Sequence, residues 1–152
     1  MLLSVGGARI FIGDDVGDAM SSPAEVSGAG HDWQEITAAE SLGFLGISWE
    51  THSFTPDDAD PQFTVSVKTN MAGQAMQLIL ALDPEDPGQT RLSEALHSRS
   101  DYAFRLDFPD GINRRLWRAS VISFSEVFDE ANSVMKIQAD LQINSPITRE
   151  TA

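Results

Sequence analysis

A strict two-residue alternation near the C-terminus constrains the fold more than any other feature of the sequence. Every second residue of this run is apolar: Ile137, Ala139, Leu141 and Ile143. The residues between and beside them are polar: Lys136, Gln138, Asp140, Gln142 and Asn144. Because successive side chains of a β-strand point to opposite faces, the pattern predicts a strand with one buried and one wet face. Such a strand needs a sheet to join.

Other runs supply the remaining strands of that sheet. Alternation over 63–68 and 76–82 predicts two strands, and the MAGQ segment between them predicts a hairpin turn. A third strand is predicted over 102–108. It is followed by Pro-Asp-Gly, where Gly111 can adopt the positive φ of a tight turn, and residues 117–121 form the returning strand. ARIFIG near the start predicts one strand more. The fold class is therefore mainly β, a β-sandwich or a partly closed barrel.

One flanking α-helix is predicted at about residues 87–97. Asp86 can serve as the N-cap, Pro87 fits the first helical position, and Gln89 can reach back to the cap. The segments 19–32 and 51–63 are expected to be loops. The segment DWQEITAAES has two possible interpretations: a helix that starts at Asp32, or an irregular segment that crosses the fold.

The charge of the chain disfavours nucleic-acid binding. The formal net charge is -13, and residues 1–67 contain one basic side chain against eleven acidic ones. A surface this acidic repels phosphate. The longest apolar stretch, MAGQAMQLILAL, contains two glutamines and is too short to span a bilayer, so we expect a soluble protein made in a cytoplasm.

The sequence contains no recognisable catalytic or metal-binding pattern. With no cysteine, the chain has no disulfide, thiolate ligand or thiol nucleophile. The histidines stand alone, no serine lies in a G-x-S-x-G elbow, and the two acidic clusters lack the spacing of a calcium loop. We therefore expect no enzyme activity, no cofactor and no metal.

Three arginines, Arg114, Arg115 and Arg118, follow the tight turn at Gly111. They are either solvated surface charge or a patch that meets an acidic neighbour. Because the acids of the N-terminal half have few cations near them in the sequence, a second copy of the chain is the obvious acidic neighbour. The second interpretation predicts a head-to-tail homo-oligomer.

Several segments in order resemble the tail tube proteins of bacteriophages with long non-contractile tails, or of a related gene transfer agent. The resemblance lies in GGARIFIG, DWQEITAAESLGFLGISWE, MAGQAMQLILALDPEDPGQTRLSEAL, YAFRLDFPDGINRRLWRASVISFSEVF and SVMKIQADLQINSPIT. It covers most of the chain, and DPGQ together with the Pro-Asp-Gly hairpin is its most specific part.

The resemblance implies a structural virion protein, formed by one tail tube domain over residues 1–152. Its copies would form hexameric rings that stack into a hollow tube, assembled in the host bacterial cytoplasm. The implied partners are other copies and the tape measure, tail terminator and distal tail proteins. By position, the inter-subunit arms would be the N-terminal segment 1–13, the loop 55–62 with Asp57, Asp58 and Asp60, and the C-terminal tail 146–152.

The polar face of the last strand is a candidate lining of the channel. Its residues would be Gln138, Asp140, Gln142 and Asn144, and phage DNA would pass without specific binding. An ordinary solvated sheet face explains the same pattern. Two other functions stay open: the tube protein of a contractile tail or a type VI-like secretion system, and a stand-alone β-sandwich that binds a ligand in a cleft lined by Trp33, Trp49 and Trp117.

Overall fold

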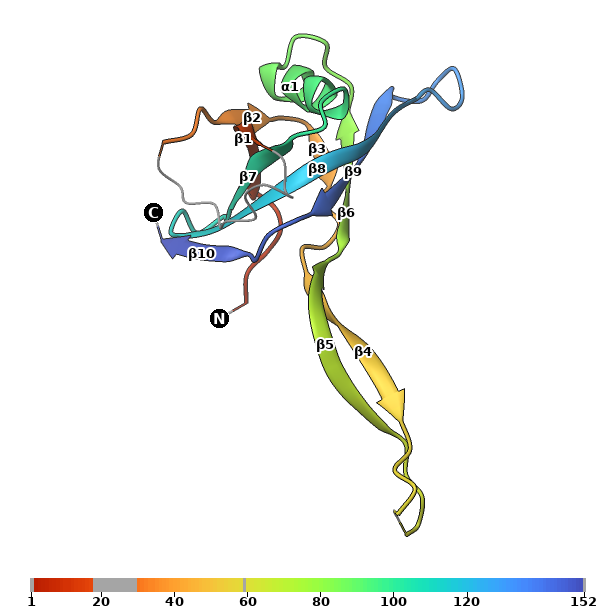
Figure 1. The fold of residues 1–152 in the computed structure, drawn as a ribbon. Coiled ribbons are helices and arrows are strands. Elements are labelled where there is room, and N and C mark those ends of the chain that lie inside the picture. The colour runs from red at the N-terminus through yellow and green to blue at the C-terminus, as the bar shows by residue number, and fades with distance from the viewer. Residues whose placement is uncertain (1, 18–29, 59, 152) are drawn as a thin grey trace.

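The computed structural model describes residues 2–17, 30–58 and 60–151, so most of the predicted loop 19–32 lies outside the described residues. The elements in this part of the chain are, in order, β1 (Arg9–Gly17), β2 (Gln34–Ile36), β3 (Ala39–Ser41), β4 (Ile47–Phe54), β5 (Val65–Gly73), β6 (Ala75–Ala81), α1 (Pro87–Leu96), β7 (Asp101–Asp107), β8 (Asn113–Val127), β9 (Lys136–Ile143) and β10 (Thr148–Thr151) (Figure 1). The prediction of a mainly β chain with one flanking helix is confirmed over these residues.

One antiparallel sheet forms the body of the molecule. Its strand order is β2-β1-β7-β8-β9-β6-β3, and β10 pairs with the start of β8. Side chains from both halves of this sheet share one core, which includes Ile12 of β1, Phe104 of β7, Leu78 of β6 and Leu141 of β9. The sheet therefore curls around a common interior, while β2 and β3 at its two ends leave the barrel open.

The alternation of the last strand is confirmed in full. Along β9 every second residue is buried, from Ile137 to Ile143, and the strand pairs with β6 on one side and β8 on the other. The hairpin of β7 and β8 is also present, with Gly111 at a φ of 71°. Backbone N–H groups of Asn113 and Ile112 donate to the Asp110 carboxylate and lower its pKa.

The predicted helix forms α1, and its cap also connects distant segments. Asp86 accepts a hydrogen bond from the Gly88 N–H at 3.3 Å and another from the Thr37 N–H at 3.0 Å. The expected return of Gln89 to the cap is wrong, because its amide donates to the Ala81 carbonyl at 2.8 Å instead. A Cβ at Gly88 would lie 2.1 Å from the Glu35 carbonyl oxygen, so this helix packs on β2 at backbone distance.

The predicted MAGQ hairpin is wrong. β5 and β6 do not pair with each other but follow one another almost in line (Figure 1). β5 pairs instead with β4 in a separate two-stranded sheet, and residues 51–54, expected in a loop, belong to β4. The DWQEITAAES segment, left open between a helix and a crossing, contains the short strands β2 and β3.

Candidate assembly surfaces

A long hairpin, here called the arm, projects from the body of the molecule (Figure 1). It consists of β4, β5 and the tip, residues 55–64. Exposed apolar side chains occur along its whole length: Trp49, Phe54, Phe63, Val65, Val67 and Met71. Phe63 is 73% exposed and Met71 is 54% exposed. The arm therefore carries apolar surface that its own chain does not cover.

Near the tip of the arm, one cross-strand pair is apolar and the next is polar. The pair Phe54–Val65 shares one face, and the pair Ser53–Ser66 shares the other, where the two hydroxyls lie 2.9 Å apart. Residues of both pairs are exposed. An isolated two-stranded hairpin is at best marginally stable in water. The exposure of both faces leaves the arm with little packing of its own.

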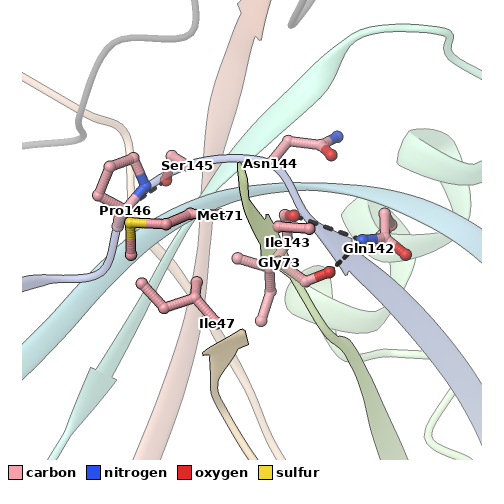
Figure 2. A pocket seen from close by; sticks show the side chains of 9 residues that line it. Ile47, Met71, Gly73, Gln142, Ile143, Asn144, Ser145 and Pro146 are labelled. Carbon is pink, nitrogen blue, oxygen red and sulfur yellow. Dashed lines mark hydrogen bonds between the residues drawn. The ribbon is translucent and has the colours of Figure 1, made fainter. Parts of the chain in front are cut away.

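Hydrogen bonds connect the arm to the body at its root, the point where β5 ends and β6 begins (Figure 2). The Gln142 side-chain amide donates to the Gly73 carbonyl oxygen at 2.8 Å, and the Gln74 N–H donates to the Gly46 carbonyl at 3.0 Å. Ile47 packs against the core. An open groove at this root is lined by Ile47, Met71 and residues 142–146.

Replacing Gly73 by alanine is expected to destabilise the root of the arm. A Cβ at this position would lie 1.9 Å from the Ile143 carbonyl oxygen, so the backbone of β5 or β9 has to shift. We expect a loss of about 1–3 kcal/mol in the free energy of unfolding, measured by urea denaturation. Gly6→Ala is the matched control, because its Cβ would meet only the Ser4 hydroxyl, at 3.4 Å. Equal stability of the two variants would contradict this account of the root.

The second half of β8 has one edge without a strand partner among the described residues, and α1 also contacts β8. β7 pairs with β8 only as far as Ala119, whereas β9 continues along it to Val127. Among the described strands, none pairs with the other edge of residues 120–127. Ile122 on this stretch is 55% exposed. Free edges of this length are surfaces on which another chain can add a strand.

The three arginines after the turn do not form one exposed cluster. Arg114 Nε lies 3.4 Å from Asp107 Oδ1, at the distance of an ion pair. The Arg115 guanidinium lies over the Phe108 ring, 4.5 Å from its centroid. For Arg118 the prediction of a surface charge is wrong, because its side chain is buried and its Nε donates to Asp101 Oδ2 at 3.0 Å.

A charge network beside Arg114 was not foreseen from the sequence. Arg9 donates two hydrogen bonds to Glu35, at 2.8 and 2.9 Å, and this contact lowers the pKa of Glu35. The Arg105 guanidinium lies 3.9 Å from the centroid of the Phe11 ring. Partial burial lowers the pKa of Arg105, although the nearby charge of Asp107 acts to raise it. The sequence did not indicate this network because its residues meet through the registers of four strands, β2, β1, β7 and β8.

The acidic candidates lie at the tip of the arm, where Asp57, Asp58 and Asp60 are exposed. The channel candidates alternate along β9 and its end as expected, although their side chains also bind within the chain. Asp140 accepts a hydrogen bond from Ser123 at 2.8 Å, and Asn144 donates to Asp101 at 3.0 Å. That this face lines a channel stays a prediction.

The two chain ends are partly built into the sheet. Residues 9–13 belong to β1, where Ile10 and Ile12 are core residues, so the part of the expected N-terminal arm that the structure leaves outside the sheet is 2–8. Within the C-terminal tail, β10 pairs with β8 of the same chain, with Arg149 opposite Arg115 and Glu150 opposite Arg114. Of the three candidate inter-subunit segments, the tip of the β4–β5 hairpin thus extends farthest from the body (Figure 1).

No family model and no curated protein matches the sequence. Solved structures do match over nearly the whole chain. A chain of the SPP1 tail tube superposes with a TM-score of 0.70 at 10% identity, covering 99% of this chain and 80% of that one. A chain from the sheath-tube complex of an extracellular contractile injection system, PVC, gives 0.65 at 10% identity, covering 99% and 93%. The protein has the tail tube fold.

A third similar structure is a cap that terminates a tube. A chain of the anti-feeding prophage cap matches with a TM-score of 0.60 at 13% identity, covering 100% of this chain and 93% of that one. At these identities the likeness concerns the tail tube fold, which extends over the entire chain. In the described residues, no helix has both the length and the apolar character to cross a membrane.

Proposed function

We propose that this protein is the repeating subunit of a hollow tube. The observation that carries the proposal is the sheet surface left open by a single chain: an arm exposed on both faces, and an edge at residues 120–127 of β8 with which no described strand pairs. Copies that pair such edges form a barrel wider than one chain can close. A ring interface with a second, axial interface generates a tube. The tail tube fold supports the same function.

We further propose that the tube is that of a non-contractile phage tail or a related gene transfer agent. The rings are hexameric and stack into a virion tail, which assembles in the bacterial cytoplasm together with tape measure, terminator and distal tail proteins. DNA passes through the channel without specific binding, because a chain with a net charge of -13 offers phosphate little attraction. On this proposal the face with Gln138, Asp140, Gln142 and Asn144 lines the channel.

A tube inside a contractile sheath is the second candidate. It is favoured by the likeness to a chain in the PVC sheath-tube complex, whose TM-score of 0.65 is close to that of the SPP1 chain. A contractile system requires an outer face that binds sheath. Co-purification of the assembled protein with a sheath protein would favour this candidate over the non-contractile tail.

The ligand-binding alternative receives no support from the tryptophans. Trp117 is buried and stacks on Phe104, with ring centroids 5.9 Å apart. Trp33 lies beneath the Arg105 guanidinium, and Trp49 lies on the arm beside Lys68. The three rings therefore do not line a common cleft.

We expect the purified protein to form rings or tubes as its concentration rises. Six domains of this size around a channel give an outer width of about 100 Å. Negative-stain electron microscopy and sedimentation velocity measure the particles, and higher salt should weaken those contacts that depend on exposed charges. A sample that remains monomeric at its highest soluble concentration would contradict the proposed function.

A further inference from the structure

A groove beside the root of the arm contains two arginines on an apolar floor. Its walls include Leu45, Ile47, Leu106, Phe108, Arg115 and Arg149. Arg115 of β8 and Arg149 of β10 lie directly opposite each other in the strand pairing. Their side chains therefore emerge on the same face of the sheet. Two like charges meet at this point of the surface.

The charges of this pair are not neutralised within the described residues. Neither Arg115 nor Arg149 forms an ion pair there, whereas Arg114 has Asp107 at 3.4 Å. Asp110 is influenced by the charge of Arg115, but its carboxylate accepts hydrogen bonds from the backbone of its own turn. Like charges in opposite positions on neighbouring strands are destabilising. Arg149 thus has no ion-pair partner among the described residues, and Arg115 influences Asp110 without forming an ion pair with it.

The tip of the arm has the complementary chemistry. Asp57, Asp58 and Asp60 are exposed, and no cation of the described residues forms an ion pair with them. Phe63 beside them is 73% exposed. β4 contains 8 residues, so its length of about 27 Å separates this tip from the groove at the root. The two surfaces cannot meet within one copy.

We propose that the tip of the arm of one copy docks in the Arg115–Arg149 groove of the next copy along the tube. The inference rests on the proposed tube function and names one of its contacts. Carboxylates of the tip pair with the two guanidinium groups, and Phe63 covers apolar surface at Leu45 and Leu106. Because donor and acceptor surfaces lie at opposite ends of one arm, the contact is heterologous and repeats along the axis.

Cysteine cross-linking tests the contact directly, since the chain has no cysteine of its own. An Asp58→Cys variant mixed with an Arg149→Cys variant should form disulfide-linked dimers under mild oxidation, seen on a non-reducing gel. Asp57 and Asp60 remain on one copy and Arg115 on the other, so the charge attraction is reduced but not removed. Asp58→Cys mixed with Arg99→Cys is the control, because Arg99 is also exposed and lies after α1. Equal yields in the two mixtures would overturn the proposal.

Charge exchange provides a second measurement. Arg149→Glu should raise the concentration needed for assembly about tenfold, and Arg99→Glu, which changes the net charge equally, should leave it unchanged. Adding Asp58→Lys to Arg149→Glu in the same chain should restore part of the loss, because the exchanged charges attract again. If the wild type forms tubes and Arg149→Glu assembles equally well, the proposed docking is wrong and the proposed tube function remains supported. Failure of the wild type to assemble would overturn both.

Discussion

Removing the arm is expected to abolish assembly and to leave the body folded. Ile47 and Gly73 are partners in the strand pairing, so a two-residue Asn-Gly turn can join them in place of residues 48–72. None of the described residues within 48–72 belongs to the buried core. We therefore expect the free energy of unfolding of the body to change by about 1 kcal/mol or less. The variant should sediment as a monomer at every concentration at which the wild type forms rings or tubes.

A smaller replacement separates the roles of the two parts of the arm. Exchanging residues 55–62 for a short turn retains β4 and β5 and removes the acids of the tip. Rings should still form through the strand edges, and their stacking should weaken. Circular dichroism melts report the fold of both variants, and electron microscopy reports the particles. Tubes of normal length from the variant without the arm would contradict the assembly role of the arm.

Replacing Asp101 by alanine is expected to cost about 3–5 kcal/mol of stability, because the change removes the carboxylate that pairs with a buried guanidinium. Asp101 and Arg118 are each 2% exposed, and their Oδ2 and Nε atoms lie 3.0 Å apart. The same carboxylate accepts a hydrogen bond from Asn144 at 3.0 Å. Urea denaturation measures the loss.

A double variant tests whether the lost counter-charge is the cause. Asp101→Ala combined with Arg118→Met removes both charges and should recover much of the stability that the single change loses. Near-additive losses would instead show that packing and the hydrogen bonds of Asp101 dominate. A loss below about 1 kcal/mol in the single variant would contradict the structural role of the pair.

Sequence patterns predicted the elements in which burial is one-sided. Along β9 the core takes every second side chain, so the alternation is visible in the residues themselves. The turn at Gly111 and the start of α1 were predicted because glycine, proline and a capping carboxylate have strong local preferences. Within the arm, alternation over 63–68 indicated β5, but β4 lacked such a signal: it is exposed over nearly its whole length, so no contrast between a buried and a solvated face marks it as a strand.

The candidate surfaces were harder to predict because they depend on long-range partners. Arg118 was grouped with its neighbours in sequence, but its counter-ion Asp101 lies on another strand, and this pairing places the guanidinium inside. Arg149 was not singled out, since it becomes the neighbour of Arg115 only when β10 folds back on β8. Register between strands, which a single sequence does not display, decides both cases.

An arm that is exposed on both faces has a kinetic consequence for growth. In a free subunit, holding this hairpin ordered costs conformational entropy with little apolar burial in return. If the protein is the proposed tube subunit, the end of a growing tube offers a preformed template that orders an incoming arm. Elongation is then faster than nucleation, so the number of tubes is set by how often a first ring forms rather than by the supply of subunits.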